Sequence, residues 1–290
     1  MVFAGETMST SDTPLSSTEG DAQPNGGDAK PAAGAPLLSL KAITKTFGPV
    51  RALTDVDLDV PAGLVTALVG DNGAGKSSLI KTVSGLWPPD GGEIIWEGEP
   101  VRLHGPRDAE ALGITTIYQD LALADNLDIV QNMFLGHELL RHRMLDEGTM
   151  ELSARKTLED LHVTTVRSIR QEVASLSGGQ RQSVAVAKAV MSQAKLVIMD
   201  EPTAALGVAQ TTMVLDLIKR LSQRGVAVLL ISHNLIDVFE VADRIAVLYL
   251  GRLAVAGPAS EFDRQSVVEY MTTGTAGAPP NGQGAPQTAS

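Results

Sequence analysis

The amino-acid sequence predicts an α/β protein built on a mainly parallel β-sheet. Continuous apolar runs of strand length alternate with segments of helical periodicity along the chain. Such runs are typical of strands that are buried on both faces of a parallel sheet. Glycine and proline residues fall at the joints between these segments, as at Gly91, Gly105 and Gly257. The sequence shows no repeat of this core, so we expect a single domain.

The elements can be placed in chain order. Strands are expected over residues 64–69, 196–199, 226–231 and 245–250, and helices over residues 76–86, 179–192, 208–223 and 258–271. The stretch from about 121 to 175 lacks strong strands and contains two polar helical segments. It is interpreted as a helical insertion in the α/β core.

The two ends differ from this core in composition. Residues 1–36 are mostly Gly, Pro, Ala, Ser and Thr, and residues 274–290 carry no charge. Neither end has enough apolar side chains to offset the entropy of ordering, so both are expected to be disordered tails. The predicted domain therefore spans residues 37–273.

Composition excludes several classes of function. The 290 residues carry a formal net charge of −11, which disfavours a broad electrostatic contact with nucleic acid. The absence of cysteine excludes disulfides, iron–sulfur clusters, cysteine-ligated zinc and thiol catalysis. The start of the chain lacks the basic and apolar regions of a signal peptide, and the apolar run at 226–231 is too short to cross a bilayer. We therefore expect a soluble protein that reaches a membrane through a partner.

A phosphate-binding loop follows the first apolar strand. The sequence GDNGAGKS at 70–77 matches G-x-x-x-x-G-K-[ST] between a strand and a helix. Its glycines let backbone N–H groups point at phosphate oxygens, and the helix that follows adds its positive N-terminal end. Lys76 would contact the β- and γ-phosphates and Ser77 would bind Mg²⁺. The predicted nucleotide-binding residues here are Gly70, Asp71, Asn72, Gly73, Ala74, Gly75, Lys76, Ser77 and Ser78. The motif alone fits a kinase, a GTPase or a motor.

Two adjacent acids end the apolar run at 196–199. Asp200 and Glu201 should lie at the carboxyl end of a core strand, where open α/β sheets bind their ligands. Neighbouring residues of a strand point to opposite sides, so the two acids should serve different purposes. We assign Asp200 to Mg²⁺ through water, and Glu201 to the attacking water as a general base or polarising group.

The sequence LSGGQ opens the helical run at 179–192. Ser177, Gly178, Gly179 and Gln180 combine a hydroxyl, flexible backbone and a helix N-terminus, which together can bind an anion. Taken alone, the same residues fit an ordinary serine N-cap before flexible glycines.

These motifs, followed by the histidine of ISHN at 231–234, resemble in their order the ATP-binding-cassette (ABC) ATPases. The resemblance covers residues 37–273 and implies a P-loop NTPase core of ABC type with an antiparallel β subdomain and a helical subdomain. It also implies roles for Gln119 at Mg²⁺, the attacking water and the membrane-subunit interface, for His233 at the γ-phosphate, and for Phe47 against adenine. Residues 177–180 would contact the ATP that is bound by a second copy, in a head-to-tail dimer.

The segments at 84–95, 106–113 and 118–136 are similar to ATP-binding subunits of bacterial monosaccharide importers of the ribose, xylose and fructose class. The resemblance implies an ATP- and Mg²⁺-dependent ATPase at the cytoplasmic face of the membrane. It also implies a membrane permease and a separate sugar-binding protein as partners. The alternatives are a soluble ABC ATPase that acts as a scaffold or regulator, and an importer subunit for a substrate other than a sugar.

The chain departs from the family pattern at two positions. Where the family has a short SALD run, residues 204–207 read AALG, so the final acid is replaced by Gly207. Lys188 stands where many members have arginine, which retains the charge but loses the planar fork. Neither change touches Lys76, Asp200, Glu201 or His233, so we expect an active ATPase.

Overall fold

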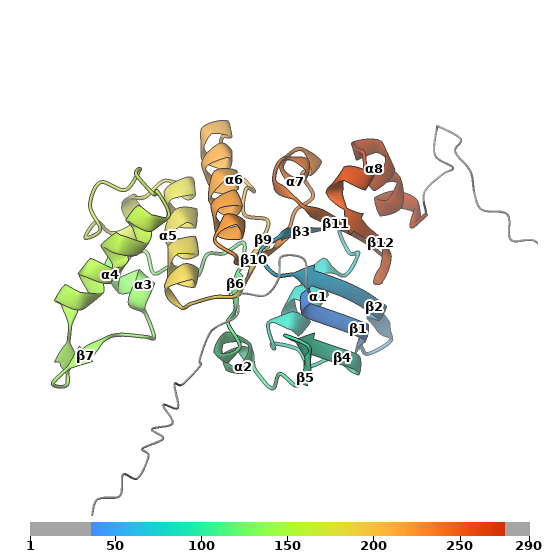
Figure 1. The fold of residues 1–290 in the computed structure, drawn as a ribbon, viewed down its shortest axis with the longest axis horizontal. Helices are drawn as coiled ribbons and strands as arrows, with labels where there is room; N and C mark the ends of the chain where they lie inside the picture. The colour runs from blue at the N-terminus through green and yellow to red at the C-terminus, as the bar shows by residue number, and fades with distance from the viewer. Residues whose placement is uncertain (1–35, 276–290) are drawn as a thin grey trace, which may run out of the picture. The chain divides into compact units, whose positions relative to one another are not determined.

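The computed structural model describes residues 36–275. Its main sheet has six strands in the order β12-β11-β3-β10-β9-β6 (Figure 1). Strands β11, β3, β10, β9 and β6 are parallel, and β12 pairs antiparallel to β11. The strand bounds are β3 Val65–Val69, β6 Ile114–Ile117, β9 Leu196–Asp200, β10 Ala227–Ile231, β11 Arg244–Tyr249 and β12 Arg252–Pro258.

A second, antiparallel sheet of four strands has the order β2-β1-β4-β5. Its strands are β1 Pro36–Phe47, β2 Val50–Pro61, β4 Gly91–Trp96 and β5 Glu99–Val101. A small hairpin pairs β7 Leu140–Arg141 with β8 Met144–Leu145. The α/β class with an antiparallel β subdomain and a helical subdomain is therefore confirmed.

The helices are distributed over these sheets and the helical subdomain. Their bounds are α1 Lys76–Val83, α2 Pro106–Ala111, α3 Ile129–Phe134, α4 Glu147–Asp160, α5 Gly178–Met191, α6 Val208–Gln223, α7 Leu235–Val241 and α8 Arg264–Thr273, with 3₁₀ turns η1 Val173–Ser175 and η2 Ala259–Glu261. In Figure 1, α3 and α4 lie on one side of α5 and α6 lies on the other, and α1 lies between the two sheets.

Alternate residues of the parallel strands build cores on opposite faces of the sheet. On β9, Val197 and Met199 pack in the cluster that contains residues of α3, α4, α5 and α6. Leu196 and Ile198 pack in the cluster that contains α1 and the antiparallel sheet. This follows from the two-residue repeat of a strand, and it explains why the strands consist of continuous apolar runs.

Two predicted boundaries were wrong. The last helix begins at Arg264 and not at residue 258, because β12 continues to Pro258 and Asp263 forms a capping box with Ser266. The helix predicted over 76–86 ends at Val83, since Gly85 has a φ of 73° that an α-helix does not allow.

The predicted domain boundaries remain largely predictions. Pro36, which we placed in the tail, is the first residue of β1, and Gly274 forms the left-handed C-cap of α8. Thr275, the next residue of that predicted tail, exchanges hydrogen bonds with the hydroxyl of Thr273. Residues 1–35 and 276–290 lie outside the described part of the chain. Residues 121–175 contain α3, the β7–β8 hairpin, α4 and η1.

Candidate functional site

The loop between β3 and α1 needs glycine at two of its positions. Gly70 has a φ of 157°, and a Cβ atom there would collide with the carbonyl oxygen of Leu248. Gly75 has a φ of 106°, and its Cβ would lie 2.7 Å from the carbonyl oxygen of Ala52. Only glycine combines these left-handed backbone angles with such close approach of neighbouring main chain. The loop is therefore folded tightly against the β11–β12 and β2 segments.

The side chain of Lys76 is positioned by the loop itself. Its Nζ atom donates hydrogen bonds to the carbonyl oxygens of Gly70, at 2.6 Å, and Asp71, at 3.0 Å. Burial lowers the pKa of Lys76, while the carboxylates of Glu201, Asp200 and Asp71 raise it. The ammonium group of Lys76 is thus near three carboxylates but forms an ion pair with none of them within residues 36–275. Its positive charge can therefore meet a bound anion.

A cavity of about 590 Å³ brings the phosphate loop together with distant parts of the chain. Nine of the predicted site residues line it: Asn72, Gly73, Gly75, Lys76, Ser77, Ser78, Gln119, Asp200 and Glu201. Sequence reasoning missed five others, Val50, Arg51, Ala52, Leu250 and Gly251. They come from the start of β2 and from the β11–β12 turn, and no local motif marks them.

Asp200 and Glu201 enter the cavity from the end of β9. Glu201 leaves the strand with a φ of 50°, and its backbone N–H donates to the carbonyl oxygen of Ile231 at 2.9 Å. Burial raises the pKa of Asp200, and the adjacent Glu201 raises it further, while Lys76 acts in the opposite direction. The surroundings of the Asp200 carboxylate thus favour the binding of a cation.

The donor set fits Mg²⁺. Ser77, Gln119 and Asp200 place a hydroxyl, an amide and a carboxylate on the lining of one cavity. Magnesium prefers hard oxygen ligands and is usually bound by one or two protein groups together with phosphate oxygens and water. An oxygen-only set beside a phosphate loop meets that preference.

His233 does not line the cavity, but it contacts Glu201, which does. Its Nδ1 atom is 2.8 Å from Oε1 of Glu201, and its side chain is 69% exposed. The histidine follows β10, the strand between β3 and β9 in the sheet. The sheet order thus places it next to the acid that sequence reasoning assigned to the attacking water.

Ser177 caps helix α5 at a different place. The Ser177 side chain accepts a hydrogen bond from the N–H of Gln180 at 3.4 Å, and the Gln180 side chain accepts from the N–H of Ser177 at 2.9 Å. A Cβ atom on Gly178 would lie 2.8 Å from Leu206, and one on Gly179 would lie 2.7 Å from Met213. None of the residues 177–180 lines the phosphate-loop cavity. Within one chain, the structure does not bring this turn to the predicted nucleotide site.

Phe47 also lies outside the lining of the cavity. Its ring meets Trp87 edge-on, with the ring centroids 4.7 Å apart, and its side chain is 38% exposed. Lys45, two residues earlier, is anchored by Asp90 at 2.8 Å and by the carbonyl oxygen of Pro88 at 2.7 Å. The end of β1 is therefore fixed to the segment that follows α1. The adenine contact of Phe47 stays a prediction.

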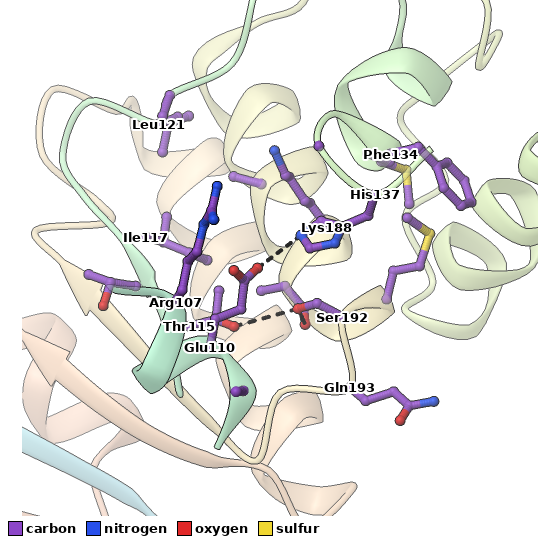
Figure 2. Close-up of a pocket in the computed structure, with 18 of the residues that line it drawn as sticks. Arg107, Glu110, Thr115, Ile117, Leu121, Phe134, His137, Lys188, Ser192 and Gln193 are labelled. Carbon is purple, nitrogen blue, oxygen red and sulfur yellow. Dashed lines mark hydrogen bonds and ion pairs between the residues drawn. The ribbon is translucent and has the colours of Figure 1, made fainter. Parts of the chain in front are cut away.

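A second cavity, of about 810 Å³, separates α2 and β6 from α3 and α5 (Figure 2). His137 Nε2 lies 3.0 Å from Oε1 of Glu110 across it, and Lys188 projects from α5 beside this pair. Burial lowers the pKa of Lys188, and Glu110 and Glu138 offset part of that change. Lys188, at the position of the family arginine, thus lines this groove and not the phosphate-loop cavity.

Comparison with known proteins identifies the family. The profile of the family described as ABC transporter matches residues 53–204. The fructose import ATP-binding protein of Rhizobium meliloti is 47% identical over 245 residues, which cover 82% of this chain and 94% of that protein. The xylose/arabinose import ATP-binding protein of Sulfolobus acidocaldarius is 45% identical, over 82% of this chain and 94% of that protein. The chain belongs to the ABC transporter family.

The fold agrees with solved cassettes of this family. The crystal structure of an ATP-binding cassette of an ABC transporter in its ADP conformation superposes with a TM-score of 0.71 at 25% identity. The match covers 82% of this chain and 95% of that one. Among residues 36–275, no helix combines the length and the apolar character that crossing a bilayer requires.

Proposed function

We propose that this chain is the ATP-hydrolysing subunit of an ABC importer that powers uptake of a monosaccharide through a partner permease. The observation that carries the proposal is the cavity that joins Lys76 and Ser77 to Gln119, Asp200 and Glu201. The names of the fructose and xylose/arabinose import proteins, at 47% and 45% identity, support the sugar class. A scaffold or regulator without a permease, and an importer subunit for another substrate, are the alternatives.

The residues divide the reaction between them. The phosphate-loop N–H groups and Lys76 hold the phosphates, and Ser77, Gln119 and Asp200 would hold Mg²⁺, which supplies charge neutralisation at the β- and γ-phosphates. Glu201 accepts the proton of the attacking water while the water oxygen bonds to the γ-phosphorus and the bond to the bridging oxygen breaks. His233, whose Nδ1 atom contacts Glu201, would contact the γ-phosphate. The products are ADP and phosphate.

A second copy of the chain would complete each site. Ser177 and Gly178 are exposed, and none of the residues 177–180 lines the phosphate-loop cavity of its own chain. In a head-to-tail dimer, this turn would contact the triphosphate that the partner's phosphate loop holds. Hydrolysis then weakens the contact between copies and lets them separate.

Complementation between two inactive variants tests this arrangement. Lys76→Ala removes the phosphate contact, and Ser177→Arg places a bulky cation in the proposed dimer contact. Each variant alone should lose ATPase activity, but a mixture should regain part of it, because one of the two sites in a mixed dimer keeps both halves intact. Lys156→Ala, an exposed site on α4, is the control. If the mixture stays as inactive as its components, the shared site is wrong.

The groove of Figure 2 is the surface we assign to the permease. It lies next to Gln119 in sequence, through Ile117 and Leu121, and it combines apolar walls with Arg107, Glu110 and Lys188. This contact would hold the chain at the cytoplasmic face of the membrane. Purification of the tagged chain in detergent should recover a polytopic membrane protein and a sugar-binding protein, whereas recovery of soluble partners alone would favour the scaffold alternative.

A further inference from the structure

We propose that the β7–β8 hairpin binds the anionic phospholipid headgroups of the membrane surface. The hairpin has the sequence LLRHRML at 139–145. The inference rests on the proposed function to the extent that a permease brings the chain to a membrane. It revises the expectation that membrane contact goes only through a partner, since a surface contact needs no apolar run of spanning length.

Exposed apolar side chains gather at this hairpin. Of the thirteen large apolar side chains that are exposed among the described residues, five fall within residues 135–145. Met144 is 71% exposed, Leu140 67% and Leu145 54%. Scattered single apolar residues are common on protein surfaces, but a contiguous group indicates a contact surface.

The tip of the hairpin is basic in an acidic protein. Arg141, His142 and Arg143 are all exposed, whereas the chain as a whole has a net charge of −11. Within residues 36–275, neither Arg141 nor Arg143 forms an ion pair or a side-chain hydrogen bond. By contrast, Arg170 of the same subdomain meets three carboxylates at 3.1–3.2 Å. The two hairpin arginines are thus available to an external anion.

The backbone of the turn presents these side chains at an energetic cost. His142 has a φ of 52° and Arg143 a φ of 68°. A two-residue hairpin turn with both φ values positive favours Asn-Gly, because bulkier residues are strained in this region. The sequence therefore has a histidine and an arginine at positions where the turn alone would favour smaller residues.

The position of the hairpin favours lipid over a protein partner. Gly136, His137 and Leu139 line the groove assigned to the permease, but none of the residues 140–145 lines it. In Figure 1, the hairpin and α2, on the two sides of this groove, both lie toward the lower edge of the view. A permease segment bound in the groove would therefore leave the tip of the hairpin uncovered, next to that segment. Arginines that meet phosphate, next to apolar side chains that enter the headgroup region, suit a fluid anionic surface.

Sedimentation with vesicles tests the proposal. The full chain is mixed with vesicles of phosphatidylcholine alone, or of phosphatidylcholine with phosphatidylglycerol. We expect it to pellet with the anionic vesicles only, and to be released in about 1 M salt, where screening is nearly complete. Arg141→Gln with Arg143→Gln should lower the partition coefficient on the order of 30-fold, since each basic residue near an anionic surface contributes about a 5-fold effect.

A second variant separates charge from folding. His142→Asn with Arg143→Gly gives the turn its preferred residues, so the hairpin should stay folded while vesicle binding falls. Arg264→Gln on α8 and Leu152→Ser on α4 are matched controls at exposed positions and should bind as wild type.

The results that overturn the proposal are equal binding to both kinds of vesicle, no binding, or unchanged binding of the hairpin variants. A further comparison uses vesicles that also contain the permease. If the hairpin variants lose binding to these vesicles but not to pure anionic lipid, the hairpin contacts the protein and the proposal is overturned. ATPase activity in solution is measured on every variant. A wild-type chain that hydrolyses ATP but does not bind lipid would refute this inference alone. A wild-type chain that does not hydrolyse ATP would refute the proposed function.

Discussion

The Nδ1 atom of His233 lies 2.8 Å from the Oε1 atom of Glu201. The two residues follow neighbouring strands, β10 and β9, which run parallel and end at the same edge of the sheet. The histidine side chain is 69% exposed and that of the acid 17%. The pair therefore consists of a sheltered carboxylate and an accessible imidazole, an arrangement in which the histidine can respond to a ligand while it orients the acid.

Replacement of Glu201 by glutamine should separate ATP binding from turnover. Glutamine retains the shape of the side chain but cannot accept a proton from water, so the turnover rate should fall at least about 100-fold. ATP binding should persist, and ATP should then hold the chain as a dimer in sedimentation. Glu99→Gln, at an exposed position of β5, is the control and should behave as wild type. A Glu201→Gln chain that hydrolyses ATP at the normal rate would remove the acid from its assigned role.

Trp87 should report nucleotide binding through Phe47. The two rings lie 4.7 Å apart, and Trp96, the other tryptophan, is only 4% exposed in the core. A nucleobase that stacks on Phe47 should therefore change the fluorescence of Trp87 and leave that of Trp96 unchanged. Phe47→Ala should weaken ATP binding on the order of 10-fold, as expected for the loss of one stacking contact of about 1–3 kcal/mol.

The control for the fluorescence signal is Trp87→Phe, which should abolish the change but retain ATP binding measured by dialysis. If Phe47→Ala binds ATP as tightly as wild type, the adenine lies elsewhere in the site.

Asp90→Asn should destabilise the protein near neutral pH. The Asp90 carboxylate accepts hydrogen bonds from Lys45 and from the N–H of Thr46, and these contacts lower its pKa below the usual 3.8. The free energy of unfolding should fall by about 1 kcal/mol. The value is modest because Lys45 is buried but Asp90 is half-exposed, so that solvent screens the ion pair. Urea unfolding measures the difference.

The pH dependence of this effect has a definite sign. A carboxyl with a lowered pKa in the folded state contributes its stability above the pKa of the unfolded chain, and loses it as the pH falls through the folded value. The difference in free energy of unfolding between wild type and Asp90→Asn should therefore disappear in acid. Asp59→Asn is the matched control, because its partner Lys41 is 49% exposed at 3.4 Å, and it should have almost no effect at any pH. A gap that persists below the pKa of Asp90 would contradict the assignment.

Gly207→Asp should stabilise the protein. Gly207 is the N-cap of α6, its φ of −74° and ψ of 163° suit any residue, and the helix has no side-chain cap. A Cβ atom at this position would meet nothing within 4 Å. An aspartate there should add a few tenths of a kcal/mol through a hydrogen bond to a free N–H group. The urea midpoint should rise with an unchanged slope.

Gly207→Ala is the comparison for this prediction. Alanine adds the Cβ atom without a hydrogen-bond acceptor, so it should be less stable than Gly207→Asp by about 1 kcal/mol. Equal stability of the two variants would show that a side-chain cap at residue 207 does not stabilise α6.

The sequence alone determined the elements whose causes are local. The phosphate loop is fixed by the glycines that its backbone angles require, and β3, β9, β10 and β11 follow from apolar runs buried on both faces. The antiparallel sheet was expected only from family resemblance, since the register shifts along β1 interrupt any simple alternation of apolar and polar residues. The start of α8 was missed because β12 extends through Gly257 to Pro258.

Tertiary structure alone decided which distant residues meet. Strand β10 lies between β3 and β9, so the phosphate loop, the acids after β9 and His233 after β10 converge at one edge of the sheet. Gln119 reaches the same cavity because β6 pairs with β9, while Phe47 turns toward Trp87. Strand order sets these distances, and it depends on how whole elements pack together to bury their apolar faces, which no short stretch of sequence contains.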